Sequence, residues 1–483
     1  MLFNSLEFLI FLPLAFLGFW FVFRKLRTQN FYVLFISYLF YGWWDWRFLF
    51  LIAITTITCF YAGRWIQSAR TKKTARVALW LNILFNIGIL VVFKYFNFFS
   101  ESLKVIFEQF GYQLDWFTID VLLPVGISFY TFQAISYPID VYRKKTHAIN
   151  DIVAFSAFIS FFPQLVAGPI ERSTQLLPQF LRKREFSYDA AVDGMRQMLW
   201  GFFKKIVIAD NCALIANSIF DNYAVCDTGT LWIGAFFFTF QVYGDFSGYS
   251  DIAIGVARLF GFNLSRNFRF PYFSRSIAEF WRRWHISLNS WFMDYVYFPL
   301  GGSRCSKTVT YRNIMIVFLL SGLWHGANWT YVIWGAYNGL LIVAAAIIFG
   351  KKKHDMMFPN RFFPGLRQTM QIIITFGLVL VGMIIFRSED MTSAAGYVAK
   401  CFFGNTMYDG TPSPISGIKV KVVLTVIMIM LMQLADWTQR NKVYGLQIVQ
   451  GRNIVIRWGC YAFLIFAILC FAGAQEQFIY FQF

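Results

Sequence analysis

His325 is the residue of this chain whose setting most strongly suggests chemistry. It lies in an apolar stretch that holds no charged side chain between Arg312 and Lys351. An ionisable group in such a stretch is costly and is a candidate for function. Burial favours the neutral imidazole, which can take a proton from a hydroxyl group while that oxygen attacks an activated carbonyl. The competing interpretation is a structural histidine packed between helices.

The residues beside His325 could orient the imidazole and leave space around it. On one continuous helix, Ser321 and Asn328 would share a face with His325, four residues before it and three after it. Either side chain could then fix the tautomer of the imidazole. Gly322 and Gly326 leave room for a substrate or a second backbone to approach closely.

A second histidine, His285, lies in a stretch rich in tryptophan. His147 and His354 follow basic residues instead and are predicted to lie in loops. Asp294 follows His285 by nine residues, on the opposite face of a straight helix, so we do not expect the two to pair. Apolar residues around His285 recur at helical spacing and predict an amphipathic helix at the membrane surface: Trp281, Trp284, Leu288, Trp291 and Tyr295.

Two carboxylates, Asp245 and Asp251, lie in a polar cluster between apolar segments. Carboxylates near membrane depth need partners. We therefore predict structural ion pairs, rather than direct catalysis, with the downstream arginines Arg258, Arg266, Arg269 and Arg275.

The elements that position these residues are predicted to be membrane helices. Hydrophobic residues make up 58% of the 483 residues and charged residues 14%, whereas soluble proteins carry roughly 25% charged residues. Apolar runs of membrane length predict an all-α integral membrane protein with roughly ten or more transmembrane helices. The clearest runs are Leu9–Phe23, Phe31–Tyr41, Phe48–Gly63, Val77–Phe93, Ile372–Phe386, Lys421–Leu434 and Ile454–Ala472, with Leu231–Phe240 and Ile314–Phe349 less clean.

The chain is predicted to be one polytopic domain over residues 1–483, with its functional core at about residues 123–338. Prolines and glycines interrupt the apolar runs in that core, and non-helical backbone at membrane depth is tolerated only around a cavity or inside protein. The segment Pro163–Arg172 is the clearest candidate for a broken or re-entrant stretch.

The positive charge of the chain is spread over the ends of its apolar runs. Glu7 is the only charge before Arg24, which is not how a cleaved signal begins. Basic connections alternate with connections poor in bases, which predicts an N-terminus outside and the basic connections in the cytoplasm. The net charge of +18 is therefore assigned to topology and anionic lipid contact rather than to nucleic acid. Seven scattered cysteines indicate neither a disulfide framework nor a zinc site, and no metal site is predicted.

Five ordered motifs make the chain similar to the membrane-bound O-acyltransferase family. They are Pro124–Gln133, Phe162–Ile170, Asp245–Asp251, Glu279–Leu300 and Gly322–Asn328. Within this family the chain resembles the bacterial branch that includes the alginate O-acetylation membrane protein. Gly244 departs from the family pattern, where a bulkier residue is expected, and affects only the expectation for local packing.

The resemblance implies a ring of membrane helices around a thinned core, with re-entrant and amphipathic interfacial helices. It implies that His325 is the catalytic base and that His285 and Asp294 are further active-site residues. An acyl thioester such as acetyl-CoA would be the donor, and no cofactor is expected. Candidates for contacting the substrates are Ser321, Asn328, Trp324, Arg275, Arg282 and Arg283; the arginines are equally well explained as cytoplasmic positive charge.

The expected activity is transfer of an acetyl group from the cytoplasm, across a bacterial cytoplasmic (inner) membrane, to an exported polysaccharide or to a separate periplasmic or extracellular acetyltransferase. One alternative keeps the fold and changes the cargo to D-alanine or a lipid acyl chain. Another is a glycan transporter or flippase in which His325 relays protons.

Overall fold

A computed structural model describes residues 1–112, 118–119, 122–166, 168–350, 362–404, 413–473 and 476–481. Every regular element in these ranges is helical, so the all-α prediction is confirmed for them. The chain forms two compact units: residues 1–195 with 253–265, and residues 196–252 with 266–483. The division falls inside two helices, α10 (Tyr188–Phe202) and α12 (Thr228–Leu259). The prediction of one domain over the whole chain stays a prediction.

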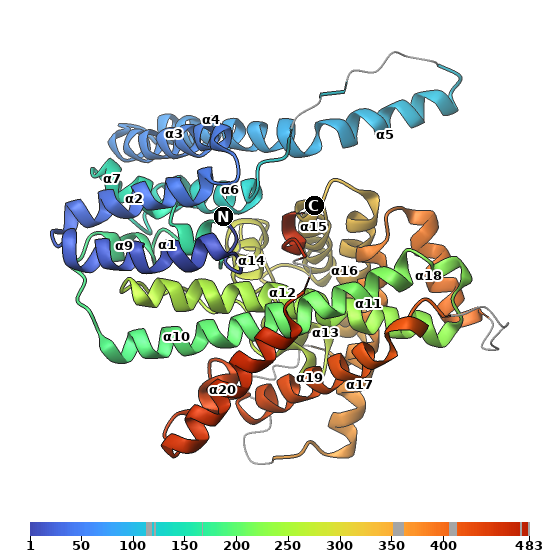
Figure 1. The fold of residues 1–483 in the computed structure, drawn as a ribbon. Helices are drawn as coiled ribbons and strands as arrows, with labels where there is room; N and C mark the ends of the chain where they lie inside the picture. The colour runs from blue at the N-terminus through green and yellow to red at the C-terminus, as the bar shows by residue number, and fades with distance from the viewer. Residues whose placement is uncertain are drawn as a thin grey trace. The chain divides into compact units, whose positions relative to one another are not determined.

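The first unit is built from helices that enclose a phenylalanine-rich core. Helix α3 packs against α4 and α6, and α2 packs against α7; Figure 1 shows α3 and α4 side by side along most of their length. The elements of this unit are α1 (Leu6–Leu17), α2 (Leu26–Gly42), α3 (Leu49–Ser68), α4 (Lys72–Leu90), α5 (Phe96–Gln109), α6 (Ile127–Tyr142), α7 (Ile152–Ile159), α8 (Phe162–Leu165) and α9 (Leu177–Phe180).

The segment predicted to be broken, Pro163–Arg172, is helical only in α8 and irregular from Gly168 onward. Glu171 in this segment is 1% exposed, and its carboxylate accepts hydrogen bonds from Ser265 N at 2.5 Å and from Ser265 Oγ at 3.0 Å. Burial outweighs these hydrogen bonds and raises the pKa of Glu171 to about 7. The break is therefore confirmed, whereas its re-entrant position in a membrane stays a prediction.

Glu171 is expected to make stability fall as the pH rises. Its folded pKa lies above the unfolded value of 4.5, so its contribution is fully present below about pH 4.5 and is lost as the pH rises through about 7. A shift of this size corresponds to on the order of 3 kcal/mol. Glu171→Gln is expected to flatten the dependence of the melting temperature on pH between about pH 5 and about pH 8. An unchanged slope in this variant, or equal flattening in the exposed-site control Glu185→Gln, contradicts the prediction.

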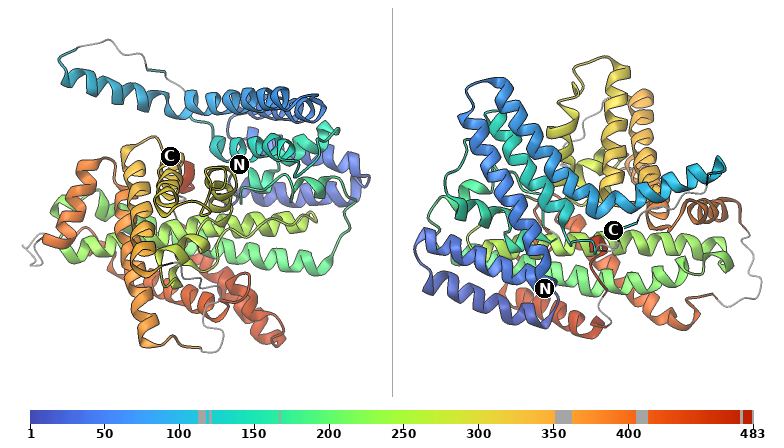
Figure 2. Two further views of the ribbon diagram at one scale, coloured as in Figure 1. Left: turned by 180° about the vertical axis from the view of Figure 1, so that it is seen from behind. Right: turned by 90° about the horizontal axis from the view of Figure 1, so that it is seen from above.

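The second unit carries both histidines of interest. Besides the last part of α10 and the first part of α12, its helices are α11 (Asp210–Phe220), α13 (Ile277–Arg283), α14 (Ile286–Phe292), α15 (Lys307–His325), α16 (Trp329–Phe349), α17 (Leu366–Arg387), α18 (Met391–Phe403), α19 (Lys419–Thr438) and α20 (Ile454–Phe471). The apolar stretch Ile314–Phe349 is therefore two helices rather than one. Figure 2 shows α15 and α16 as a closely packed pair, in yellow and gold.

Glycines bring α15 and α16 into backbone contact. A Cβ on Gly322 would overlap the carbonyl oxygen of Tyr331, and a Cβ on Gly335 would overlap the carbonyl oxygen of Phe318. A Cβ on Gly326 would overlap the ring of Tyr331. These positions need glycine because a second backbone or a large ring lies where the side chain would begin.

Adding one methyl group to this contact is expected to destabilise the protein. Gly335→Ala should cost about 1–3 kcal/mol, because the two helices must separate to admit the Cβ. The matched control is Gly377→Ala in α17, where a Cβ meets open space, and where helix propensity predicts a gain of about 1 kcal/mol. Melting of the purified variants in one detergent measures both effects. Equal changes in the melting temperature of the two variants would show that the α15–α16 contact has room for a Cβ at position 335.

Six helices of the described residues are long and apolar enough to cross a membrane, by length and composition alone. Two shorter apolar helical stretches, Leu6–Val22 and Ile152–Leu165, accompany them. The prediction of roughly ten or more passes, with a ring around a thinned core, stays a prediction. The six helical stretches are Trp46–Ser68, Lys72–Gln109, Trp329–Phe349, Leu366–Arg387, Ser416–Thr438 and Ile454–Phe471.

Candidate active site

His325 is the last residue of α15 and is enclosed by aromatic rings. His325 is only 3% exposed. Four ring centroids lie around the imidazole, from α15, α16, α17 and the short segment 479–481: Trp324 at 5.0 Å, Trp334 at 5.0 Å, Phe386 at 5.5 Å and Tyr480 at 5.6 Å. The helix ends here because Gly326 adopts an extended backbone. The predicted burial of His325 is confirmed.

His285 lies between α13 and α14 with a left-handed backbone, at φ 44°. It is 1% exposed, and its Nδ1 lies 3.0 Å from Oδ1 of Asn267. The same oxygen accepts a hydrogen bond from Ser287 Oγ at 2.9 Å, while Nδ2 of Asn267 donates to Ser250 Oγ at 3.3 Å. Because Oδ1 is an acceptor, the hydrogen-bond network assigns the proton of His285 to Nδ1 and leaves Nε2 as the basic nitrogen.

The two histidines share the same aromatic neighbours. The Trp324 ring lies 5.9 Å from the ring of His285, and the Tyr480 ring lies 6.3 Å from it. Burial, with a smaller contribution from His325, lowers the pKa of His285 well below its ordinary value. This part of the second unit therefore holds a neutral imidazole beside a second imidazole, in surroundings made largely of aromatic rings.

The amphipathic surface helix predicted around His285 is wrong in two respects. The helix is interrupted at Trp284 and His285, which separate α13 from α14. The tryptophan stripe is buried rather than exposed at headgroup level, with Trp281 at 7% and Trp284 at 2% exposure. Trp281 also donates a hydrogen bond from Nε1 to Asn338 Oδ1 at 3.2 Å. The stripe is helical packing inside the protein and not a membrane anchor.

Three further predicted site residues take different places. Ser321 is buried one turn before His325 on α15, as expected. Asn328 does not share that face, because α15 ends at His325; it caps α16 instead, and its Nδ2 donates to the carbonyl of Glu389 at 2.7 Å. Asp294 is half-buried in the π-helical segment Met293–Tyr297 that follows α14.

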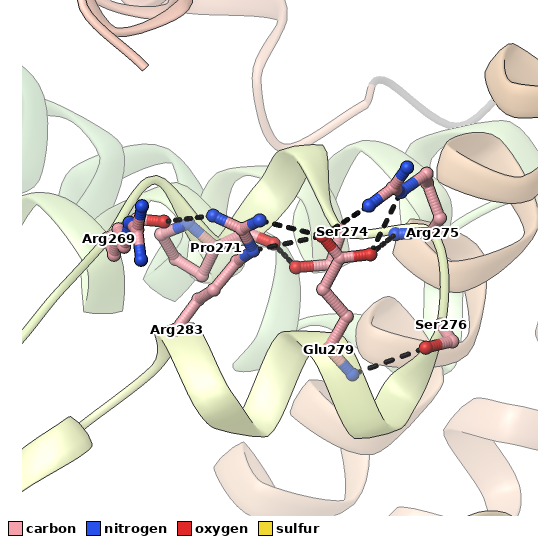
Figure 3. A network of polar contacts seen from close by, with 7 residues as sticks. All are labelled: Arg269, Pro271, Ser274, Arg275, Ser276, Glu279 and Arg283. Atoms are coloured by element: carbon pink, nitrogen blue, oxygen red, sulfur yellow. Dashed lines mark hydrogen bonds and ion pairs between the residues drawn. The ribbon is translucent and has the colours of Figure 1, made fainter. Parts of the chain in front are cut away.

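Two of the three arginines predicted to contact the substrates form ion pairs with Glu279. Arg275 Nε lies 3.0 Å from Oε2 of Glu279, and Arg283 Nη2 lies 2.7 Å from Oε1. Figure 3 shows both guanidinium groups directed at the one carboxylate, with Arg283 also reaching the carbonyl of Arg269. Arg282 points elsewhere on α13 and is exposed. The pair of buried arginines thus has a structural partner, and Arg282 is the one of the three at the surface.

Asp245 and Asp251 form ion pairs, as predicted, but with lysines rather than the downstream arginines. Lys205 Nζ lies 2.8 Å from Asp245 and 2.8 Å from Asp210, and Lys204 Nζ lies 2.5 Å from Asp251. Three of the arginines proposed as partners bind elsewhere: Arg258 pairs with Asp193, Arg266 donates to the carbonyls of Phe268 and Lys442, and Arg275 pairs with Glu279.

The buried lysine cluster also holds segment 476–481. Lys205 Nζ donates to the carbonyl of Glu476 at 3.0 Å, and Ile479 N donates to Oδ2 of Asp245 at 2.7 Å. Phe478 packs on Tyr249 with ring centroids 4.4 Å apart. These contacts fix the segment where the ring of Tyr480 faces both histidines.

Sequence reasoning missed Asn267 and Tyr480. Asn267 binds His285 from 18 residues earlier in the chain, and no helical spacing connects them. Tyr480 is one of 24 tyrosines and lies far from every motif. An aromatic residue near the end of an aromatic-rich chain carries no distinctive signal. The signal for Asn328 was present, since asparagine before a helix is a common N-cap.

The sequence model of the "MBOAT, membrane-bound O-acyltransferase family" matches residues 145–386. The chain belongs to this family. The matched region of this family member contains His285, Asp294 and His325, whereas Tyr480 lies beyond it. The chain is therefore an O-acyltransferase and a multi-pass membrane protein, as the sequence predicted.

The similar curated proteins of the family come from several bacteria. "Probable alginate O-acetylase AlgI" of Azotobacter vinelandii is 41% identical over 88% of this chain and 83% of its own length. "Peptidoglycan O-acetyltransferase" of Helicobacter pylori is 29% identical over 100% of this chain and 98% of its own length. "Teichoic acid D-alanyltransferase" of Bacillus subtilis is 30% identical over 55% of this chain and 69% of its own length.

Proposed function

We propose that this O-acyltransferase moves an acetyl group from a cytoplasmic acyl thioester to an exported polysaccharide, or to a partner acetyltransferase that acts on one. The catalytic role of His325 rests on one observation: a buried imidazole that shares its aromatic surroundings with a second, neutral imidazole. The acetyl cargo and the polysaccharide acceptor are supported by the names of the alginate and peptidoglycan relatives. The protein is proposed to lie in a bacterial cytoplasmic membrane with its N-terminus outside.

In the proposed reaction, His325 accepts the proton of an acceptor hydroxyl while that oxygen forms a bond to the thioester carbonyl carbon. The carbon–sulfur bond then breaks, and the thiolate takes the proton from the imidazolium. The products are an acetyl ester and a free thiol, so atoms and charge balance without a cofactor. His285 is proposed to act through its basic Nε2, with Asn267 holding its tautomer.

The cytoplasmic donor is proposed to be acetyl-CoA or a comparable thioester. Arg282 is the preferred contact for its phosphates, because it is exposed whereas Arg275 and Arg283 are committed to Glu279. Two guanidinium groups on one carboxylate still leave one net positive charge, which favours anions at longer range.

A second candidate cargo is D-alanine, favoured by the similarity to the teichoic acid D-alanyltransferase. Competition between acetyl-CoA and an aminoacylated carrier protein, in proteoliposomes of the purified chain, separates the two cargoes. Transfer of label from the carrier alone would overturn the acetyl proposal.

The proposed function is tested by the chemistry of exported polymers. Cells with and without the chain are fed isotope-labelled acetate, and the exported polysaccharides are analysed by mass spectrometry for ester-linked label. Label that depends on the chain and is released by mild base is the expected result. Unchanged acetylation with a loss of exported polymer would instead indicate a transporter or flippase.

A further inference from the structure

The surface between α3 and α4 contains a groove that the proposed reaction does not use. Its volume is about 610 Å³, within the range of about 300–1,000 Å³ typical of small-molecule sites. Both helices are long and apolar enough to cross a membrane. Figure 1 shows them packed along each other in the first unit. The lining residues are Thr58, Tyr61, Ala62, Arg64, Trp65, Ser68, Ala78, Leu81, Asn82 and Phe85.

The walls of the groove are apolar and aromatic, and its open side faces outward. Trp65 is 47% exposed, Leu81 54% and Phe85 43%, while the small side chains of Ala62 and Ala78 leave the space between the helices unfilled. Large apolar residues that point away from the rest of a membrane protein contact acyl chains. The walls are therefore suited to one hydrocarbon chain lying along the helix pair.

The floor of the groove presents a polar atom that needs a partner. Asn82 is 6% exposed and lines the groove. Its Oδ1 accepts a hydrogen bond from the Cys59 thiol at 3.5 Å, and Asn86 Nδ2 donates to the same sulfur at 3.6 Å. This chain of bonds fixes the orientation of the Asn82 amide, and its Nδ2 has no hydrogen-bond partner among the described residues. A buried amide donor without a partner destabilises the protein, and an acceptor on a ligand would remove that destabilisation.

One end of the groove is strongly basic. Arg64 lines it, and the connection to α4 together with the first turns of α4 adds further bases at the same end: Arg70, Lys72, Lys73 and Arg76. The sequence between Asp45 and Glu101 contains no acidic residue, so these cations have no counterion on either helix. Asn82 lies six residues beyond Arg76 along α4, about 9 Å deeper than the basic end of the groove.

We propose that the α3–α4 groove binds an anionic glycerophospholipid. Its phosphate lies at Arg64 and the neighbouring bases, an ester carbonyl accepts the hydrogen bond of Asn82 Nδ2, and the acyl chain continues along Leu81 and Phe85. A lipid supplies all three groups in this order along one molecule. A free phosphate would satisfy only the basic end, and a zwitterionic lipid would place a second cation among the arginines and lysines.

Native mass spectrometry of the full chain, purified in detergent with added lipid, tests the proposal. The probes are phosphatidylglycerol, phosphatidylcholine with the same acyl chains, and inorganic phosphate. The wild type is expected to retain phosphatidylglycerol at least about fivefold better than phosphatidylcholine, since each basic side chain near an anionic lipid contributes about that factor. Inorganic phosphate is expected neither to bind nor to displace the lipid.

Two variants and one control locate the bound lipid. Arg64 is exposed, so the Arg64→Gln variant is expected to fold. It is expected to lower the retention of phosphatidylglycerol about fivefold. Asn82→Leu is expected to lower the retention of both lipids, because it removes the donor to the ester carbonyl that they share. Arg452→Gln, an exposed arginine before α20, removes the same charge and is expected to change nothing.

The proposal is overturned if the two lipids are retained equally, if inorganic phosphate displaces the lipid, or if Arg452→Gln matches Arg64→Gln. It is also overturned if Arg64→Gln retains the lipid as the wild type does. This experiment measures lipid binding and does not depend on acyl transfer. Its outcome therefore neither supports nor contradicts the proposed enzymatic function.

Discussion

His325→Ala is expected to lower acyl transfer at least about 100-fold, the usual contribution of a positioned general base, while the protein still inserts and folds. His325 is the last residue of α15 and is surrounded by aromatic rings. Alanine at this position therefore removes the imidazole but keeps the packing of the rest of α15 against α16. Transfer of labelled acetyl from acetyl-CoA in proteoliposomes measures the activity, and the melting temperature measures folding.

The control for this variant is His147→Ala, because His147 is an exposed histidine of the first unit. It is expected to keep full activity. His325→Gln adds a second comparison, since glutamine keeps polarity and most of the volume but cannot take a proton at neutral pH. Full activity of His325→Ala or His325→Gln would show that the base lies elsewhere, with His285 the next candidate.

Lys205→Met is expected to have the second large effect, on stability and on transfer together. It leaves the carboxylates of Asp245 and Asp210 buried without their shared cation, and breaking a buried pair in this way costs about 3–5 kcal/mol. Segment 476–481 also loses the hydrogen bond from Lys205 to Glu476, so Tyr480 is expected to leave the histidines. Melting temperature and labelled-acetyl transfer are measured on the same preparation.

The double variant Lys205→Met with Asp245→Asn separates the two effects. Removing both charges avoids an uncompensated buried carboxylate on Asp245 and is expected to restore a large part of the stability. Segment 476–481 still lacks the hydrogen bond from Lys205 to Glu476, so activity is expected to recover less than stability. Equal recovery of both quantities would contradict a role for the cluster in seating this segment.

The sequence was sufficient where a single stretch carried the information. The charge-free surroundings of His325 predicted a buried imidazole, and the long apolar runs predicted helices in the right places. Both properties are local, because they depend on what stands next to a residue along the chain. The Gly322–Asn328 motif also contained an asparagine before a helix, a capping signal that could have placed the end of α15 correctly.

The sequence was insufficient where distant segments decide the outcome. No proline or glycine marks the break at His285; it is stabilised by Asn267, whose carbonyl accepts from Ile286 N at 2.9 Å and whose side chain contacts the imidazole. The sequence predicts a downstream arginine as the partner of Asp245, whereas its partner is Lys205, 40 residues earlier in the π-helical segment Phe203–Ala209. Helical spacing predicts which residues are neighbours on one helix. It does not predict which residue of another helix will be the partner.

The aromatic enclosure of His325 has a consequence for the energetics of the membrane. In the proposed reaction the proton that leaves the acceptor hydroxyl ends on the departing thiol, so none is gained or lost by the site in a full cycle. A base enclosed by Trp324, Trp334, Phe386 and Tyr480 can therefore turn over without exchanging protons with either compartment. Acyl transfer should then proceed at the same rate whether or not a proton gradient is imposed on the vesicle, and the thioester bond alone supplies the driving force.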